Sequence, residues 1–234
     1  MSLAFEATIQ IAGIRSLEEA TMLEAVGVDL IGFPLRLNYH SPDITEGETQ
    51  KIIAQMENPR RAVLITYVTD AREIVAFARE TGVSTVQLHA EVSPRELHKL
   101  KGLAPHLTII KSLIVRPECA DPNHHIYSLA KELESWVDAF ITDTYDPTSG
   151  ATGATGLRHD WSVSARIAKL VRKPLIVAGG LTPFNVYDAI CAVRPAAVDA
   201  HTGVEEASGN KCPRLVAQFV AEAHRGFAAI GRKR

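Results

Sequence analysis

Short apolar runs alternate with segments of helical periodicity along the whole chain. Most of these runs are apolar at successive positions, which is typical of strands covered on both faces and therefore of a parallel sheet. The segments between them repeat their apolar residues with the period of amphipathic helices. We therefore expect eight strand–helix units, with strands in residues 8–13, 29–35, 62–68, 85–90, 107–115, 139–144, 174–180 and 196–203.

Several of the expected helices begin with a recognisable cap. Ser16, Thr45, Asp70 and Ser93 each precede a glutamate by three residues, which is the pattern of a capped helix start. In the segment TPFN we expect Pro183 to occupy the first helical position, because proline needs no amide hydrogen there.

Eight such units within 234 residues, without a linker between them, predict one domain spanning residues 1–234. The fold class is α/β, a single (β/α)8 TIM barrel, rather than an open doubly wound sheet with fewer units. We expect residues 228–234 to form a flexible C-terminal tail. In such a barrel the active site lies in the loops that follow the strands.

Composition narrows the classes of partner. The chain has 46% hydrophobic residues and 25 basic against 27 acidic residues, and no basic run long enough to follow a nucleic acid. We find no apolar run of about 18 residues and no secretory start, so we expect no membrane contact. Three separated cysteines suggest neither disulfides nor a thiolate metal site, which favours the cytoplasm. The state of assembly stays open between monomer and homodimer.

Glycines follow the last two predicted strands. The segments VAGGLTP and DAHTGVE place Gly179 and Gly180 after one strand and Thr202 and Gly203 after the next. Phosphate sites of this architecture commonly form there from main-chain amides, and glycine lets an anion approach the backbone. We expect a small phosphorylated ligand, although Gly179 and Gly180 would also suit a tight turn.

A long loop follows the sixth predicted strand. It begins near Asp143, carries glycine at 150, 153 and 156, and ends near Trp161. Long glycine-spaced loops are either functional lids or disordered segments, and we favour a lid.

Seven motifs occur in a familiar order: IQIAGIRSLEEA, GVDLIGF, TVQLHAE, DAFITDT, GATGLRHDW, IVAGGLTPFNV and VDAHTGVE. From Ile9 to Phe219 the chain resembles the phosphoribosylanthranilate isomerase family, (β/α)8 enzymes of tryptophan biosynthesis. The resemblance implies an isomerase that performs an Amadori rearrangement of an aminoaldose to an aminoketose. That reaction needs an acid for the ribose ring oxygen and a base for the proton on C2.

The chain departs from the family pattern at the base. The family's first strand ends in Lys-x-Cys-Gly, with the cysteine as base, and the matching residues here are Gln10 and Ala12. Asn38 stands where the family has an arginine that binds the anthranilate carboxylate, and asparagine lacks that charged fork. Leu157 replaces a lysine and His201 replaces a serine near the phosphate loops.

The resemblance implies Asp143 as the acid, and the histidine of its QLHG motif matches His89. We expect His89 to replace the missing base, with His40 as the second choice, because histidine titrates near neutrality. Lys111 would either neutralise a ligand or pair with a carboxylate. We expect no cofactor. The predicted site is catalytic Asp143 and His89 with substrate- or phosphate-binding Gly179, Gly180, Thr202, Gly203, His201, Asn38, His40 and Arg158.

Two other functions stay open at this stage. The histidines at the barrel mouth, with Asp143 and Glu91, would suit a metal-assisted phosphosugar epimerase or hydrolase, although they lie on separate loops. Alternatively, Gln10 and Ala12 favour a non-catalytic barrel that binds a phosphorylated metabolite.

Overall fold

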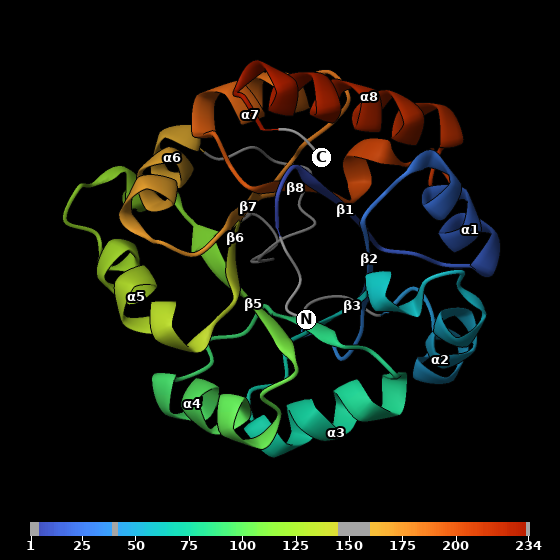
Figure 1. Cartoon of the computed structure of the whole chain (residues 1–234), viewed down its shortest axis with the longest axis horizontal. Helices are drawn as coiled ribbons and strands as arrows, with labels where there is room; N and C mark the ends of the chain where they lie inside the picture. Colours follow the sequence, from blue (N-terminus) through green and yellow to red (C-terminus); the bar gives the residue numbers. More distant parts are fainter. Residues whose placement is uncertain (1–4, 39–41, 145–159, 233–234) are drawn as a thin grey trace.

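The eight predicted strands form one closed parallel barrel in chain order, confirming the (β/α)8 TIM barrel (Figure 1). The computed structural model describes residues 5–38, 42–144 and 160–232. The strands are β1 (Thr8–Ala12), β2 (Leu30–Pro34), β3 (Ala62–Thr66), β4 (Thr85–Leu88), β5 (Thr108–Val115), β6 (Ala139–Thr144), β7 (Leu175–Val177) and β8 (Ala197–Ala200).

A helix follows each strand, and together the helices surround the barrel (Figure 1). They are α1 (Leu17–Val26), α2 (Glu46–Gln55), α3 (Ala71–Thr81), α4 (Pro94–Leu103), α5 (His125–Leu133), α6 (Trp161–Leu170), α7 (Val186–Val193) and α8 (Pro213–Ala229). Short 3-10 helices are η1 (Pro59–Arg61), η2 (Pro117–Ala120), η3 (Glu134–Trp136) and η4 (Thr202–Val204).

Side chains alternate between two buried clusters because successive residues of a strand face opposite sides of the sheet. On β1, Ile9 and Ile11 belong to the cluster between the barrel and the helices, whereas Ala12 belongs to the cluster inside the barrel. Gln10 shares the inward face with Ala12 and is fully buried. The same alternation decides which polar residues reach the inside of the barrel.

Four predicted helix caps are present. The side chains of Ser16, Thr45, Asp70 and Ser93 each accept a hydrogen bond from a main-chain N–H in the first turn of their helix. The expectation for Pro183 is wrong, because α7 begins only at Val186.

The physical reason lies in Asn185. Its Oδ1 accepts from the N–H of Thr182 at 2.8 Å, and its Nδ2 donates to the carbonyl oxygen of Gly180 at 3.0 Å. These two bonds hold residues 182–185 in a turn, so the helix starts after Asn185 rather than at Pro183.

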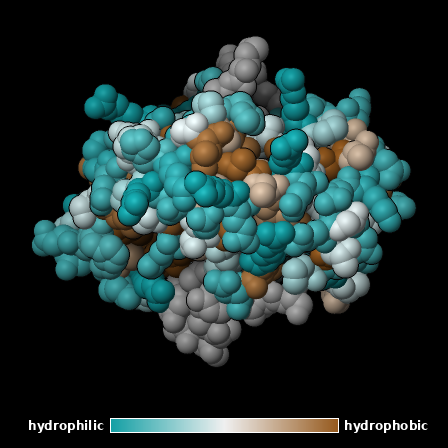
Figure 2. Space-filling model, turned by 90° about the horizontal axis from the view of Figure 1, so that it is seen from below, coloured by the Kyte–Doolittle hydropathy of each residue, from teal (hydrophilic) through white to brown (hydrophobic). Residues whose placement is uncertain are grey.

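At the C-terminus, α8 continues to Ala229, so the first two residues of the expected tail are helical. The flexibility of residues 228–234 stays a prediction, and 233–234 lie outside the described residues. No helix in the described part of the chain is long and apolar enough to cross a membrane. The side of the barrel in Figure 2 is mainly hydrophilic, with hydrophobic patches among the hydrophilic residues.

A carboxylate joins two strands near their N-terminal ends. Asp138, immediately before β6, accepts the N–H of Ile109 on β5 at 2.8 Å and pairs with Lys101 Nζ at 2.5 Å. Its side chain is 21% exposed, so removing it leaves a main-chain donor and a lysine without their acceptor in a partly dehydrated place.

We therefore expect Asp138→Ala to lower the free energy of unfolding by about 1–3 kcal/mol, the usual cost of leaving a buried donor unsatisfied. Urea denaturation followed by circular dichroism measures the change. The matched control is Asp188→Ala on the exposed face of α7, which should shift stability by less than about 0.5 kcal/mol. Equal effects of the two substitutions would contradict the structural role of Asp138.

Candidate active site

A layer of polar side chains closes the inside of the barrel toward the C-terminal ends of the strands. It comprises Gln10 on β1, Gln87 on β4, His89 just after β4, Asp143 on β6 and Asp199 on β8. Each of these residues is 9% exposed or less. Five buried polar residues in one layer cost desolvation energy, which is typical of a functional site rather than of a structural core.

Three of these side chains form a hydrogen-bonded chain. Gln10 Nε2 donates to Gln87 Oε1 at 2.8 Å, and Gln87 Nε2 lies 2.9 Å from His89 Nε2. Because an amide nitrogen only donates, His89 Nε2 is the acceptor, and the hydrogen of the neutral imidazole lies on Nδ1. Nδ1 has no hydrogen-bond partner among the described residues, so it is available to a ligand.

His89 is held in its neutral form. Burial lowers the pKa of His89 to about 3, and the charge of Lys111 adds to the effect. The ring also stacks on Tyr67, with centroids 5.6 Å apart. A neutral imidazole with its hydrogen on Nδ1 presents a donor, which does not fit the predicted role of base.

Asp143 lies on the inward face of β6 and is 6% exposed. Burial raises the pKa of Asp143 to about 7, with a further rise from the charge of Asp199 and an opposing effect of the Thr144 N–H. That N–H donates to Asp143 Oδ1 at 2.7 Å. A carboxyl group that keeps its proton near neutral pH has the property of a general acid.

Asp199 was not singled out by the sequence analysis. It pairs in register with Gln10 across β1 and β8, on the inward face of the barrel. Burial raises the pKa of Asp199 to about 7, opposed by a hydrogen bond from Gln10 and by the charge of Lys211. The available signal was its position: a carboxylate inside an apolar strand, two residues before His201 and therefore on the same face.

A buried cation supports the loop after β8. Lys211 Nζ is 2.6 Å from Glu205 Oε1 and donates to the carbonyl oxygen of His201 at 3.3 Å. His201 Nε2 lies 3.4 Å from the same Glu205 oxygen. The imidazole packs against Gly13, where an added Cβ would lie 2.0 Å from Nε2. Lys211 and Glu205 were also missed by sequence reasoning, because their pairing depends on the turn between β8 and α8.

The loops after β7 and β8 contact each other. Gly179 and Gly180 have φ of 86° and 61°, in the left-handed region that favours glycine. A Cβ on Gly203 would lie 1.9 Å from the carbonyl oxygen of Leu181, so only glycine fits there.

The main-chain amides of these loops have spare donor capacity. The N–H of Gly180 makes no turn or loop bond to another described main-chain group. Gly203 lies in the first turn of η4, where N–H groups have no partner within the helix. The predicted phosphate loops are therefore close together, with amide donors left for an anion.

The structure describes only some of the remaining predicted site residues. Asn38 is exposed after β2. His40 and Arg158, with most of the expected lid, lie outside the described residues, so their roles stay predictions. Lys111 on β5 pairs in register with Leu88 on β4. Its Nζ donates to the carbonyl oxygens of Ser112 and Leu88 at 2.6 and 3.4 Å.

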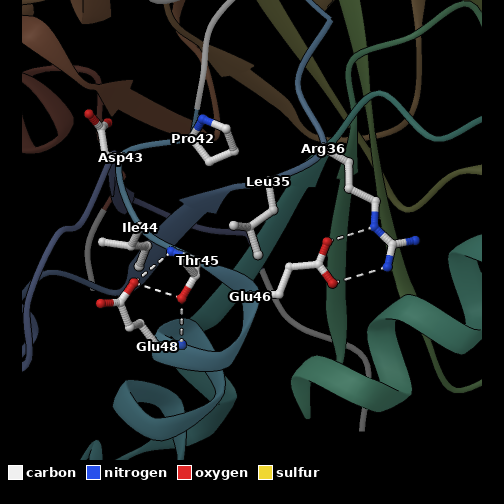
Figure 3. Close-up of a pocket in the computed structure, with 8 residues that line it drawn as sticks. All are labelled: Leu35, Arg36, Pro42, Asp43, Ile44, Thr45, Glu46 and Glu48. Atoms are coloured by element: carbon white, nitrogen blue, oxygen red, sulfur yellow. Dashed lines mark hydrogen bonds and ion pairs between the residues drawn. The ribbon is translucent and has the colours of Figure 1, made fainter.

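Arg36 is the arginine nearest to Asn38 in the sequence, and it is already paired. Its Nε and Nη2 donate to Glu46 at 2.9 and 3.1 Å, beside a hollow of about 300 Å³ between the end of β2 and α2 (Figure 3). Its Nη1 also bonds Glu73 at 3.0 Å, and the guanidinium lies 3.7 Å from the centre of the Phe77 ring. Arg36 therefore does not supply the carboxylate receptor that Asn38 lacks.

Within the described ranges, no group of three or more histidine, cysteine or acidic residues is arranged to hold a metal ion. The polar layer instead combines a protonated carboxyl, a second carboxyl, a neutral imidazole donor and nearby amide donors. That set can move protons on a ligand held by an anionic group.

The hydrogen bond from Gln87 Nε2 to His89 Nε2 predicts the tautomer of His89. We expect its resonances to show hydrogen on Nδ1 and none on Nε2, and to stay those of a neutral ring down to about pH 4, because the pKa is lowered to about 3. Long-range ¹H–¹⁵N NMR of uniformly labelled protein measures this directly, with exposed His98 as the internal control. A signal for hydrogen on Nε2, or protonation of His89 near pH 6, would contradict the assignment.

Residues 11–222 match the family model described as N-(5'phosphoribosyl)anthranilate (PRA) isomerase. Among curated relatives, N-(5'-phosphoribosyl)anthranilate isomerase 2 of Methanosarcina mazei is 38% identical over 95% of this chain and 96% of its own length.

Two solved structures show the same fold. A phosphoribosyl anthranilate isomerase in complex with reduced 1-(o-carboxyphenylamino)-1-deoxyribulose 5-phosphate has a TM-score of 0.74 at 25% identity, covering 92% of this chain and 97% of that one. Monomers of the dimeric enzyme from Thermotoga maritima reach a TM-score of 0.75 at 25% identity, with the same coverage. With a family model that matches nearly the whole barrel, the chain belongs to the N-(5'-phosphoribosyl)anthranilate isomerase family.

Proposed function

We propose that this isomerase converts a phosphoribosyl-linked amine into the corresponding aminoketose by an Amadori rearrangement, as in tryptophan biosynthesis. The observation that carries the proposal is Asp143, a buried carboxyl whose pKa is raised to about 7 inside the barrel. Family membership favours this function over the metal-assisted epimerase and the non-catalytic barrel. We expect the reaction to take place in the cytoplasm and the protein to be a monomer or a homodimer.

The first step would use the proton of Asp143. Its carboxyl group donates to the ring oxygen of the ribose, the bond between that oxygen and C1 breaks, and the amine nitrogen forms a double bond to C1. A protonated acid lowers the barrier of such a step, and general acid catalysis of this kind commonly raises the rate by about 10²–10⁴-fold.

His89 has a supporting role in this proposal. Its Nδ1–H would donate to a hydroxyl or carbonyl oxygen of the sugar, since Nε2 is occupied by Gln87. A donor with fixed direction stabilises charge that develops on oxygen during the rearrangement. His89 thus remains a predicted catalytic residue, as an electrophile in place of the base that the sequence suggested.

The phosphate would bind to the two contacting loops. Gly179, Gly180, Thr202 and Gly203 would present main-chain N–H groups, and His201 lies beside them against Gly13. Amide donors bind an anion without a charged side chain, and the family relative with a bound 5-phosphate compound is consistent with this arrangement.

The amine end of the site has no free arginine near Asn38 among the described residues. Asn38 offers no positive charge, and Arg36 is committed to Glu46 and Glu73. Losing a charged hydrogen bond to a carboxylate costs about 1.5–3 kcal/mol, or roughly one to two decades of affinity. An amine without a carboxylate therefore fits this end of the site at least as well.

Turnover of two substrates tests the proposed function. We expect the purified protein to convert N-(5'-phosphoribosyl)anthranilate, or N-(5'-phosphoribosyl)aniline, which lacks the carboxylate, into the ribulose product detected by ¹H NMR. Asp143→Asn should lower kcat by about 10²–10⁴-fold, because the amide cannot give up a proton.

Asp143→Asn should also raise stability at pH 8. The native pKa of about 7 against an ordinary 3.8 means that ionisation opposes folding above that range, by up to about 4 kcal/mol. Absence of product from both substrates would reject the function, and an Asp143→Asn protein with full kcat would reject the acid.

The phosphate loops provide a separate test. Gly203→Ala would place a Cβ 1.9 Å from the carbonyl oxygen of Leu181, which must push the β7 and β8 loops apart. We expect KM to rise at least about tenfold, equivalent to about 1.4 kcal/mol, with a smaller change in kcat.

The matched control is Gly102→Ala on the exposed surface of α4, where an added Cβ meets nothing within 4 Å. That change should leave KM unaltered and slightly favour the helix. An unchanged KM in a folded Gly203→Ala protein would remove the phosphate site from these loops.

A further inference from the structure

We propose that Asp199 is the general base of the isomerisation and performs the proton abstraction for which β1 has no group. The inference rests on the proposed function, because it assigns the second proton-transfer residue of the same reaction. It starts from β1, whose inward positions Gln10 and Ala12 cannot accept a proton at neutral pH.

The position of Asp199 suits this role. It pairs in register with Gln10, so its side chain lies beside the inward-facing residues of β1. Ala12 is the next inward-facing residue of β1 after Gln10. Asp199 Oδ1 is buried and has no hydrogen-bond partner among the described residues. A buried carboxylate oxygen without a partner is costly, and a substrate that supplies the missing hydrogen explains why it is kept.

Other groups near the polar layer are already committed. His89 Nε2 accepts from Gln87, which leaves a donor on Nδ1. Lys111 donates to two main-chain carbonyls, and Lys211 is paired with Glu205. Glu205 is shared between Lys211 and His201 and serves the loop after β8.

The charges around Asp199 are compatible with a base that works near neutrality. Asp143 faces it from β6, Lys211 approaches from the segment before α8, and His201 directly follows β8 with Glu205 nearby. In the described ranges, the inward faces of β1 and β7 contribute only uncharged side chains such as Gln10 and Ala178. Burial without an adjacent cation from β1 keeps the proton affinity of Asp199 high.

Asp143 and Asp199 then divide the two proton transfers. After Asp143 has opened the ring, C1 carries a double bond to the positively charged nitrogen. The Asp199 carboxylate takes the proton from C2, the C–H electron pair forms the C1–C2 double bond, and the C–N π pair returns to nitrogen. The resulting enol loses its hydroxyl proton and gains a proton on C1, which gives the aminoketose with no net change in atoms or electrons.

Asp199→Asn tests the assignment, because asparagine is isosteric, keeps an acceptor for Gln10 and cannot take a proton. We expect kcat on the converted substrate to fall about 10²–10⁴-fold with KM changed less than about threefold. In the unmodified protein kcat/KM should rise as Asp199 ionises and fall at higher pH as Asp143 loses its proton. In Asp199→Asn the rising limb near pH 7 should disappear.

Two further variants separate a base from a structural residue. Asp138→Asn removes a carboxylate at the opposite end of the barrel and should keep the pH profile. Ala12→Cys added to Asp199→Asn should restore at least about tenfold of kcat, with a limb moved toward the ordinary thiol pKa of about 8.5. An Asp199→Asn protein with kcat within threefold and an unchanged rising limb would overturn the proposal. So would a His201→Asn protein that alone shows the fall in kcat and the loss of the rising limb.

A readout without turnover distinguishes failure of this inference from failure of the proposed function. ¹³C NMR of the aspartate carboxyls should show Asp199 titrating near pH 7, and Asp199→Asn should lower the midpoint of Asp143 by removing a neighbouring negative charge. Without turnover of either phosphoribosyl substrate the proposed function fails on its own. An Asp199 midpoint near pH 4, together with an Asp143 midpoint that Asp199→Asn leaves unchanged, overturns the role of Asp199 in either case.

Discussion

Two carboxyl groups share one buried layer inside the barrel, and the chemistry of the site follows from that constraint. Asp143 and Asp199 come from β6 and β8, both on inward faces, and neither has an arginine or lysine bonded to its oxygens in the described residues. Water cannot fully solvate two negative charges there, so burial raises the pKa of both groups to about 7, and the charge of Asp199 adds to the rise at Asp143. Proton transfer becomes possible because the layer is poor in compensating charge.

The other members of the layer are neutral, and this keeps the constraint in force. Gln10, Gln87 and His89 are joined by two hydrogen bonds, and the imidazole is uncharged. A cation at position 10 would pair with Asp199 and lower its proton affinity. Gln10 and Ala12 can therefore be understood as one change: the thiol is absent, and the neighbouring carboxyl is left without a counter-charge.

Positive charge is instead kept at the edge of the site. Lys211 is buried but neutralised by Glu205, and Arg36 is held by glutamates on the outer side of the β2 loop. In the proposed function, a phosphate would meet main-chain amides of the loops after β7 and β8 rather than a charged side chain. A substrate would then be held by its phosphate, while its amine end would meet little charge. This arrangement would suit a substrate whose amine part carries no carboxylate.

Much of the fold could be predicted from local signals. The eight strands, four of the capped helix starts and the single barrel follow from apolar runs and cap residues, which act over a few positions of the chain. The family motifs identified Asp143, and the paired glycines indicated the β7 and β8 loops. The start of α7 was wrong because Asn185 bonds back to Gly180, a contact that the TPFN pattern does not specify.

What only the tertiary structure decided is which polar groups meet. The sequence by itself determined that β1 carries no proton-transfer group, since that depends on residue type alone. The register of β1 against β8 places Asp199 beside Gln10, and the closure of the barrel brings Gln87 between Gln10 and His89. Protonation states depend on burial and on charges from distant strands, so the roles of His89 and Asp199 emerge only once the barrel is closed.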